Sequence, residues 1–398
     1  MDLRIHPGKL TGTLSVIPSK SQAHRLLICA AFADQPTVLH CPDTNRDMEA
    51  TACCLNALGA DIQRTETGYA VIPCGVPVNS AVLPCKDSGS TLRFLLPVVG
   101  ALGVDASFQM EGRLPQRPLS PLWEEMERMG CHLSYMDANT LHCSGQLRCG
   151  EYRIDGSVSS QFITGLLFAT ALLPGKSKII VTGKIESRPY IEMTRNAMKI
   201  FGRSTEDFIV TGGLPFHSPK TYTVEGDWSN GAFFLAANTL GSSIAVKNLS
   251  ENSLQGDRAA ATLLRDLKQH CVISAADIPD LVPILSVIAS CNQGAVFTDI
   301  QRLRLKESDR IASVIAMLQN LGGSAEATEN TLKIFGTGLT GGCVDCACDH
   351  RIAMATAMAA IACQEPVVLM GAECVEKSYP LFWEKYRKLG GNYEQYIR

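Results

Sequence analysis

The sequence reads Leu58-Gly59-Ala60-Asp61-Ile62 where a helix-like stretch gives way to a strand-like one, and Met129-Gly130-Cys131-His132-Leu133 repeats this pattern 71 residues later. A glycine just past a helix end commonly adopts a positive φ, which closes the helix. Further copies lie at 201–203, 321–323 and 389–391, and a copy without the glycine lies at 267–272. Except around that last copy, neighbouring glycines are 68 to 72 residues apart. This period is too long for a solenoid, so we predict about six copies of a larger βαβ-type unit.

Amphipathic or apolar stretches predict helices between these glycines. They cover 19–33, 45–58, 119–129, 160–173, 230–238, 309–321 and 351–362. Short β-branched runs at 178–181 and 243–246 predict strands. Strands interleaved with helices indicate an α/β or α+β fold. No low-complexity linker separates domains, and the turn Glu225-Gly226-Asp227 is the clearest candidate for an internal boundary.

Charge and hydropathy exclude some classes of protein. The 398 residues carry a formal net charge of −3, which argues against nucleic-acid binding through a broad basic surface. No apolar run reaches the ~20 residues needed to span a bilayer, and the start of the chain lacks the apolar core of a signal peptide. We therefore expect a cytoplasmic protein with no nucleic-acid or membrane partner.

The 16 cysteines predict a reducing compartment, in which most of them act as small buried hydrophobes. Cys343, Cys346 and Cys348 have metal-like spacing. A structural zinc site usually needs a second such cluster, and the chain offers none, so we expect no metal.

Several motifs place cations and small hydroxyl residues at helix starts. They are Pro18-Ser19-Lys20-Ser21 with Arg25, Lys86-Asp87-Ser88-Gly89-Ser90, Arg117-Pro118, Asp155 to Phe162 with Ser159, Ser160 and Gln161, and Asp349-His350-Arg351. Free N–H groups and the helix dipole attract anions at such positions. Each motif alone also fits a capped helix without a ligand. Together they predict a site for small molecules that carry several negative charges.

Two further segments supply acid–base candidates. Arg302, Arg304 and Lys306 alternate with leucines, so a strand there would place the cations on one face, with Glu307 following. Asp280 lies among apolar residues and prolines, where burial or nearby cations should displace its pKa. The alternatives are an ion-paired strand edge and a helix N-cap.

These motifs, in this order and with Ser187-Arg188-Pro189-Tyr190 and Lys377 added, resemble the 5-enolpyruvylshikimate-3-phosphate synthases, a family of enolpyruvyl transferases. The resemblance runs from Lys20 to Lys377. It implies a fold of two similar lobes, each with three βαβαββ units, in an inside-out barrel-like arrangement. By analogy, residues 20–224 form one lobe, residues 1–19 and 225–398 form the other, and the site lies between them.

The resemblance also implies a reaction of the shikimate pathway. The enolpyruvyl group of phosphoenolpyruvate passes to the 5-hydroxyl of shikimate 3-phosphate by addition and elimination, and phosphate is released. Asp280 would accept the hydroxyl proton, Glu307 would donate a proton to C3, and Lys20 would assist. No metal or organic cofactor is implied, and we expect a monomer.

The family's binding roles fall on matching positions of this sequence. Those for shikimate 3-phosphate are Lys20, Ser21, Arg25, Ser159, Ser160, Gln161, Ser187, Tyr190, Asp280 and Lys306. Those for phosphoenolpyruvate are Lys20, Gly89, Arg117, Gln161, Arg310, Arg351 and Lys377.

The sequence departs from the family pattern in three places. Well-known members have Asn at Asp87, Pro at Phe94 and, in some cases, Asn at Arg302. The first two flank Gly89, where the family's inhibitor glyphosate contacts the loop, so the response to glyphosate is left open.

Three other functions are alternatives to this interpretation. A sister enzyme acts on a UDP-amino sugar, but it has Lys-Asn in place of Lys20-Ser21 and a reactive cysteine that the Arg117 segment lacks. An RNA 3′-end cyclase would need a nucleotide-accepting histidine and a basic track. Retention of both Asp280 and Glu307 disfavours an inactive binding protein.

Overall fold

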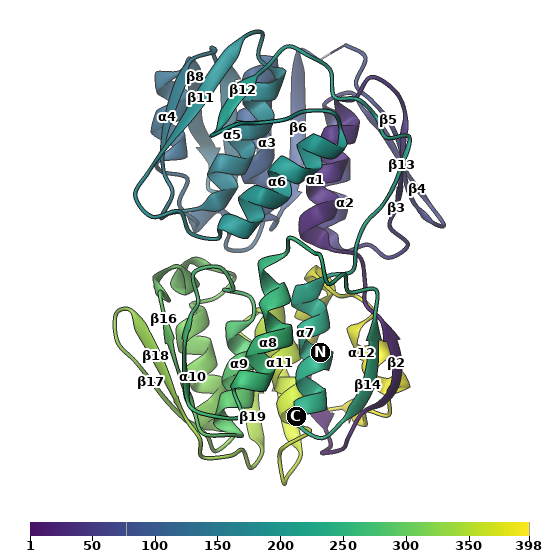
Figure 1. Cartoon of the computed structure of the whole chain (residues 1–398), viewed down its shortest axis with the longest axis vertical. Helices are drawn as coiled ribbons and strands as arrows, with labels where there is room; N and C mark the ends of the chain where they lie inside the picture. Colours follow the sequence, from purple (N-terminus) through teal and green to yellow (C-terminus); the bar gives the residue numbers. More distant parts are fainter. Residues whose placement is uncertain (77, 398) are drawn as a thin grey trace. The chain divides into compact units, whose positions relative to one another are not determined.

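The computed structural model describes residues 1–76 and 78–397 (Figure 1). The chain forms two compact units, one made of Met1–Ile17 with Gly226–Arg398 and the other of Pro18–Glu225. We call them the terminal unit and the central unit. Each has a hydrophobic core of its own, drawn from residues between Ala23 and Val224 in the central unit and between Leu3 and Leu389 in the terminal unit.

The described part of the central unit contains three sheets. Their strands, each list in spatial order, are β13 (Thr221–Thr223), β3 (Thr37–His40), β5 (Gly68–Ile72) and β4 (Asp61–Thr65); β6 (Ser80–Lys86), β7 (Asp105–Met110), β9 (Thr140–Gly145) and β8 (Cys131–Asp137); and β10 (Glu151–Asp155), β11 (Lys176–Thr182) and β12 (Ile209–Thr211).

The terminal unit also has three sheets among the residues described. Their strands are β19 (Gly342–Asp345), β20 (Val367–Met370), β1 (Leu3–Ile5) and β21 (Tyr393–Gln395); β15 (Cys271–Ser274), β16 (Ala295–Thr298), β18 (Thr331–Phe335) and β17 (Ser324–Ala327); and β14 (Ser243–Lys247) with β2 (Thr11–Ser15). Every four-stranded sheet of the molecule begins with a parallel pair and continues with two antiparallel pairs. This shared design is what a repeated unit produces, and the expected mixed α/β architecture is confirmed.

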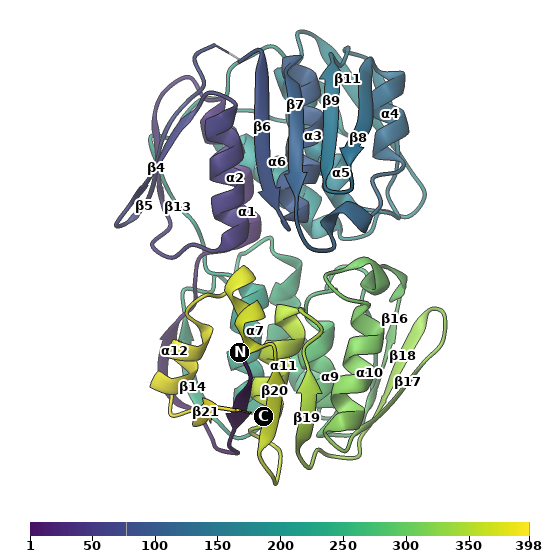
Figure 2. The same cartoon turned by 180° about the vertical axis from the view of Figure 1, so that it is seen from behind.

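The described residues form twelve α-helices in addition to these sheets (Figures 1 and 2). In the central unit they are α1 (Lys20–Ala31), α2 (Arg46–Ala57), α3 (Gly89–Leu102), α4 (Leu122–Arg128), α5 (Ser160–Leu172) and α6 (Arg188–Ile200). In the terminal unit they are α7 (Trp228–Thr239), α8 (Ala260–Asp266), α9 (Val282–Ser290), α10 (Arg310–Asn320), α11 (His350–Ala359) and α12 (Phe382–Lys388). All seven helices expected from the sequence form, with ends within three residues of those expected.

The first helix of each repeat (the odd-numbered helices) is buried on nearly all sides, because its sequence is largely apolar all round. Every residue of α9 and α11 is buried, and so is almost all of α3 and α5. Polar groups on such helices are tolerated mainly at the ends. Side chains cap five of the starts, namely Ser19 for α1, Ser88 for α3, Ser159 for α5, Asp227 for α7 and Asp349 for α11.

The glycines of the repeat have the backbone conformation that the pattern predicts. Gly59, Gly130, Gly202, Gly322 and Gly390 all have positive φ, between 73° and 118°. The copy without glycine, at 267–272, still joins a helix, α8, to a strand, β15. The glycines therefore end helices, and the period read from them is structural.

The expected strand at 302–306 is wrong. Gln301–Leu305 forms a short 3-10 helix, η3, with three residues per turn. That period places Ile300 and Leu303 on one buried side and leaves Leu305 half exposed. Alternating leucines and cations therefore gave a false period-2 signal, since only one of the two leucines enters the core. Three other 3-10 helices are η1 (Leu114–Gln116), η2 (Gly256–Ala259) and η4 (Ala372–Lys377).

The three cysteines with metal-like spacing do not gather at one point. Cys346 is buried, and its Sγ lies 3.4 Å from Sγ of Cys374, whereas Cys343 and Cys348 are exposed. The described residues include no group of three or more His, Cys, Asp or Glu side chains placed to hold a metal ion. Across all the residues that the structure describes, no helix is long and apolar enough to cross a membrane.

The repeat glycines should be sensitive to substitution. At Gly130 φ is +118°, and an added Cβ would lie 2.5 Å from the carbonyl oxygen of Gln146. Backbone strain and this overlap should make Gly130→Ala less stable by about 1–3 kcal/mol. Gly8 is a matched control, because its φ is ordinary and a Cβ there would meet nothing within 4 Å. Differential scanning calorimetry should show a lower unfolding temperature for Gly130→Ala alone; equal temperatures for both variants would contradict the role of Gly130.

Candidate active site

The first turn of α1 carries Lys20, whose charge would oppose the helix dipole if it were alone. Lys20 Nζ lies 2.8 Å from Oδ2 of Asp47 in the first turn of α2, and Asp47 is buried. The carboxylate offsets the cost of a cation at this helix start and fixes its position. Sequence analysis did not identify Asp47, because 27 residues separate it from Lys20.

Arg25 connects the start of α1 to the start of α6. Its Nη1 donates to the carbonyl of Ser21 at 2.6 Å, and its Nη2 to that of Tyr190 at 2.9 Å. Its Nε donates to Thr194 Oγ1 at 2.8 Å. Burial lowers the pKa of Arg25 to about 10, so the side chain stays cationic at neutral pH. Arg25 therefore brings Ser21 and Tyr190 together, and Ser187, three residues before Tyr190, has a left-handed φ of 54°.

Phe94, one of the departures from the family pattern, packs beneath this arginine. The Arg25 guanidinium carbon lies 5.0 Å from the centre of the Phe94 ring. A cation over an aromatic face at this distance is stabilised by the ring quadrupole. The aromatic residue therefore has a structural explanation in this chain.

Gly89 begins α3 between two arginines. A Cβ at this position would lie 2.7 Å from Nη1 of Arg117 and 2.7 Å from Nη1 of Arg93. The absence of a side chain thus lets both guanidinium groups approach the helix start, where unpaired N–H groups already favour anions. Arg93 stands one helical turn after Gly89, and that spacing was the available signal that it belongs to this group.

Gln161, at the start of α5, joins the same group. Its Nε2 donates to Ser90 Oγ at 3.0 Å, and its Oε1 accepts from Arg93 Nη1 at 3.3 Å. Arg93 Nη2 donates to the carbonyl of Pro118, next to Arg117, at 3.1 Å. The starts of α3 and α5 and the Arg117 segment are therefore tied together through side chains.

In the terminal unit, Arg310 at the start of α10 is a centre of ion pairing. The side chain is only 1% exposed. Its five N–H groups reach Asp280 Oδ1 and Glu307 Oε2 at 2.8 Å, the carbonyl of Pro279 at 3.2 Å, and both oxygens of Asp349 at 3.0 and 3.4 Å. A buried guanidinium needs such compensation. Arg310 therefore forms ion pairs with both acid–base candidates, Asp280 and Glu307.

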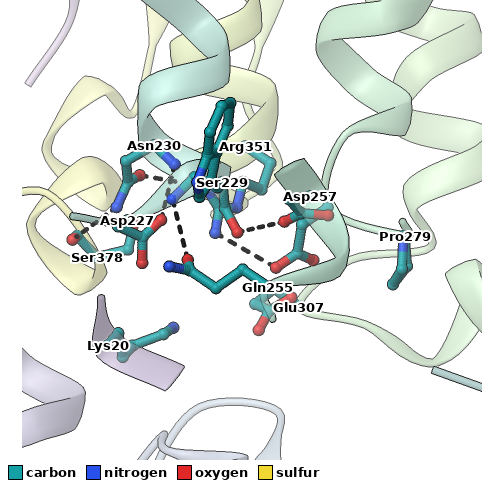
Figure 3. Close-up of polar contacts among 12 residues, drawn as sticks. Lys20, Asp227, Ser229, Asn230, Gln255, Asp257, Pro279, Glu307, Arg351 and Ser378 are labelled. Atoms are coloured by element: carbon teal, nitrogen blue, oxygen red, sulfur yellow. Dashed lines mark hydrogen bonds and ion pairs between the residues drawn. The ribbon is translucent and has the colours of Figure 1, made fainter. Parts of the chain in front are cut away.

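Arg351, in the first turn of α11, faces the same carboxylate from another side. Its Nη2 donates to Asp280 Oδ2 at 3.3 Å, and its Nη1 donates to Asn230 Oδ1 at 3.1 Å (Figure 3). Asn230 also donates through Nδ2 to the carbonyl of Ser378, next to Lys377, at 3.4 Å. Arg351 therefore connects the helix starts of α7 and α11 with the segment that precedes α9.

The electrostatic environment displaces the pKa values of three side chains here. Burial would raise the pKa of Asp280, but the cations Arg351, Arg310 and Lys306 outweigh burial and hold it well below its usual range. Burial and neighbouring arginines lower the pKa of Lys306 to about 8. Asp257, which accepts a hydrogen bond from Ser229, has its pKa raised to about 7 by burial and by Asp280. Asp280 is thus ionised at neutral pH, and of the two influences that the sequence left open, the nearby cations outweigh burial.

The predicted site residues fall into two groups, one in each unit. The group in the central unit is Lys20, Ser21, Arg25, Gly89, Arg117, Ser159, Ser160, Gln161, Ser187 and Tyr190. The group in the terminal unit is Asp280, Lys306, Glu307, Arg310, Arg351 and Lys377. The sequence analysis did not assign four further polar residues. Asp47, Arg93 and Asn230 contact members of these groups directly, and Asp257 interacts electrostatically with Asp280 and Arg351.

Comparison with known proteins places the whole chain in one sequence family. Residues 5–386 match the model of the family described as EPSP synthase (3-phosphoshikimate 1-carboxyvinyltransferase). Curated proteins named 3-phosphoshikimate 1-carboxyvinyltransferase include one from Clostridium kluyveri, 38% identical with 98% of each chain covered. Another, from Clostridium beijerinckii, is 37% identical with 99% of each chain covered.

Solved structures support the fold independently. An EPSP synthase from Acinetobacter baumannii has a TM-score of 0.81 at 22% identity, with 99% of each chain covered. The enolpyruvyl transferase NikO from Streptomyces tendae has a TM-score of 0.76 at 17% identity, with 99% of this chain and 98% of NikO covered. At these identities the likeness concerns the fold alone.

Substitution of Gly89 tests the arginine pair. Because φ is ordinary at this position and the overlapping atoms belong to flexible side chains, Gly89→Ala should fold normally. The methyl group should displace Arg93 and Arg117 and raise the KM for phosphoenolpyruvate about ten-fold or more. Steady-state kinetics measure this; Gly75→Ala, where a Cβ meets nothing within 4 Å, is the control. An unchanged KM in Gly89→Ala would show that the arginines do not bind this substrate.

Proposed function

The chain belongs to the EPSP synthase (3-phosphoshikimate 1-carboxyvinyltransferase) family, and we propose that the two groups of residues described above carry out that family's reaction. The enzyme transfers the enolpyruvyl group of phosphoenolpyruvate to shikimate 3-phosphate and releases phosphate, a step of aromatic amino acid biosynthesis. What remains to be assigned is the role of each residue.

One observation carries the assignment of the chemistry. Asp280 and Glu307 share Arg310, and Arg351 approaches Asp280 from the other side. Addition of the hydroxyl to phosphoenolpyruvate needs a base at that hydroxyl and an acid at C3, and two carboxylates in different surroundings can supply these roles. We assign the base to Asp280, the acid to Glu307 and an assisting role to Lys20.

The low pKa of Asp280 makes it a weak base before phosphoenolpyruvate binds. Its carboxylate is stabilised by the same arginines that the proposal gives to phosphoenolpyruvate. When the substrate's own negative groups occupy Arg351 and Arg310, those cations stabilise Asp280 less, and its pKa rises. Base strength is then highest when the substrate is in place.

Glu307 must also lose its pairing with Arg310 before it can act as the acid. A proton donor must be neutral, yet an arginine at 2.8 Å favours the ionised carboxylate. Because all five N–H groups of Arg310 already have acceptors, phosphoenolpyruvate can bind Arg310 only by replacing one of them. Replacement of Glu307 would free that carboxyl group to take up a proton.

The central unit supplies groups for the substrates' phosphate and carboxylate. Lys20, Gly89, Arg117 and Gln161 stand at helix starts, where cations and free N–H groups act together. We assign Ser21, Arg25, Ser159, Ser160, Ser187 and Tyr190 to shikimate 3-phosphate, together with Lys306 and Asp280 of the terminal unit. Phosphoenolpyruvate is assigned to Lys20, Gly89, Arg117, Gln161, Arg310, Arg351 and Lys377.

We propose further that the enzyme works as a monomer in the cytoplasm, without a nucleic-acid or membrane partner. Free thiols support the compartment, since all 16 cysteines are unpaired and such a composition is typical of reducing surroundings. Gel filtration at assay concentrations tests the monomer.

Release of phosphate tests the reaction and the catalytic residues together. Release should require both substrates, with none from either alone. Lys20→Ala, Asp280→Ala and Glu307→Ala should each lower kcat by about 100-fold or more while the fold survives, which a cooperative thermal unfolding transition would show. Asp277→Ala, an exposed carboxylate three residues before Asp280, should keep normal turnover. Near-normal turnover of the Asp280 variant would reject Asp280 as the base.

The pKa of Lys306 predicts a pH dependence of substrate binding. A lysine whose pKa is lowered to about 8 is cationic below that pH and neutral above it. The attraction for shikimate 3-phosphate is therefore fully present at pH 7 and is lost as pH rises through 8, by about ten-fold at pH 9. Titration calorimetry measures the affinity at each pH. Lys306→Arg, which stays cationic, should remove this decline; an equal decline in both proteins would assign it to another group.

A further inference from the structure

The start of α7 carries three polar side chains, two of which contact other segments of the terminal unit. Asp227 caps the helix by accepting from the backbone N–H of Asn230 at 2.8 Å. Ser229 donates to the buried carboxyl group of Asp257. The side chain of Asn230 is almost fully buried and forms hydrogen bonds with two further segments. The turn therefore fixes the position of groups that come from elsewhere in the chain.

Asn230 contacts one of the proposed phosphoenolpyruvate cations and the backbone next to another. Its Oδ1 accepts from Arg351 Nη1 at 3.1 Å. Its Nδ2 donates to the main-chain carbonyl of Ser378 at 3.4 Å, and Ser378 follows Lys377 directly (Figure 3). One amide thus contacts an arginine and the backbone beside a lysine, from segments 121 and 148 residues away.

The hydrogen bond from Arg351 restrains a guanidinium that has a competing partner. Arg351 Nη2 donates to Asp280 at 3.3 Å, and Asp227 and Asp257 also attract its charge. Within the described residues, Arg351 Nε has no hydrogen-bond partner although it is buried. Among the described residues, Asn230 and Asp280 accept from two of the five N–H groups of Arg351, and the other three have no hydrogen-bond acceptor.

We propose that Asn230 is a positioning residue for phosphoenolpyruvate, which holds Arg351 away from full pairing with Asp280 and fixes the backbone beside Lys377. This inference rests on the proposed function of the site. A neutral amide suits the role, because it accepts a hydrogen bond from the arginine without neutralising the charge that the substrate needs. Asn230 itself need not touch the substrate.

Two substitutions separate positioning from packing. In Asn230→Ala the arginine loses its acceptor and turns toward Asp280. In Asn230→Asp the shape is kept, but a carboxylate competes with phosphoenolpyruvate for Arg351. We expect both to raise the KM for phosphoenolpyruvate about five-fold or more, while the KM for shikimate 3-phosphate stays within about two-fold. A packing role predicts normal kinetics for the isosteric Asn230→Asp.

The same helix provides a matched control. Asn238 is also on α7, and its side chain makes two hydrogen bonds to the backbone of Ile244, at 2.8 and 2.9 Å. Asn238→Ala should lower thermal stability without changing either KM. The experiment measures phosphate release with one substrate saturating and the other varied, and thermal unfolding of every variant.

The outcomes distinguish the inference from the proposed function. Normal phosphoenolpyruvate KM in both Asn230 variants, or an equal rise in the KM of both substrates, overturns the positioning role alone. If the unsubstituted protein releases no phosphate from the two substrates, the proposed function fails and the inference fails with it. If Asn230→Ala does not fold, Asn230→Asp decides.

Discussion

Burial of two arginines is the constraint on which the terminal unit depends. Arg310 and Arg351 are 1% and 2% exposed, and an uncompensated guanidinium in such surroundings would be very costly. Asp280 and Asp349 accept from these arginines, and Asp349 is itself completely buried. Each charge is therefore tolerated only because the others are present. The removal of one partner leaves the rest unpaired, so the whole group is fixed in position before a substrate arrives.

The helices make this arrangement possible. Because α9 and α11 are buried along their whole length, only their starts can carry charged groups without disrupting the core. Repetition of one sheet-and-helix unit then supplies several such starts to each unit of the molecule. In the central unit the same principle places Lys20, Gly89 and Gln161 at the starts of three helices. The fold thus concentrates polar function at helix starts, where free N–H groups and the dipole favour anions.

Features that depend on neighbours in the sequence could be predicted, and those that depend on distant partners could not. A glycine just past a helix end and a capping Ser or Asp at a helix start act locally, so the repeat and the seven expected helices were found from the sequence. The motifs located Asp280 and Arg351 for the same reason, and the family resemblance supplied their roles. Asp47 and Asn230 were missed, because what makes them important is contact with Lys20 and Arg351 across 27 and 121 residues. At 302–306 the local signal misled, since burial of Ile300 with Leu303 favoured a period of three.

In the assignment proposed above, the same arginines serve two purposes that oppose each other in the free enzyme. A cation that attracts phosphoenolpyruvate also stabilises the Asp280 carboxylate and so weakens it as a base. The conflict disappears only when the substrate's negative groups pair with the arginines. The arginines then stabilise the Asp280 carboxylate less, and its pKa rises. A base that is weak alone and stronger beside its substrate also avoids protonation from bulk water at neutral pH while the site is empty. Binding of the anion and activation of the base are therefore one event, which follows from placing both on Arg310 and Arg351.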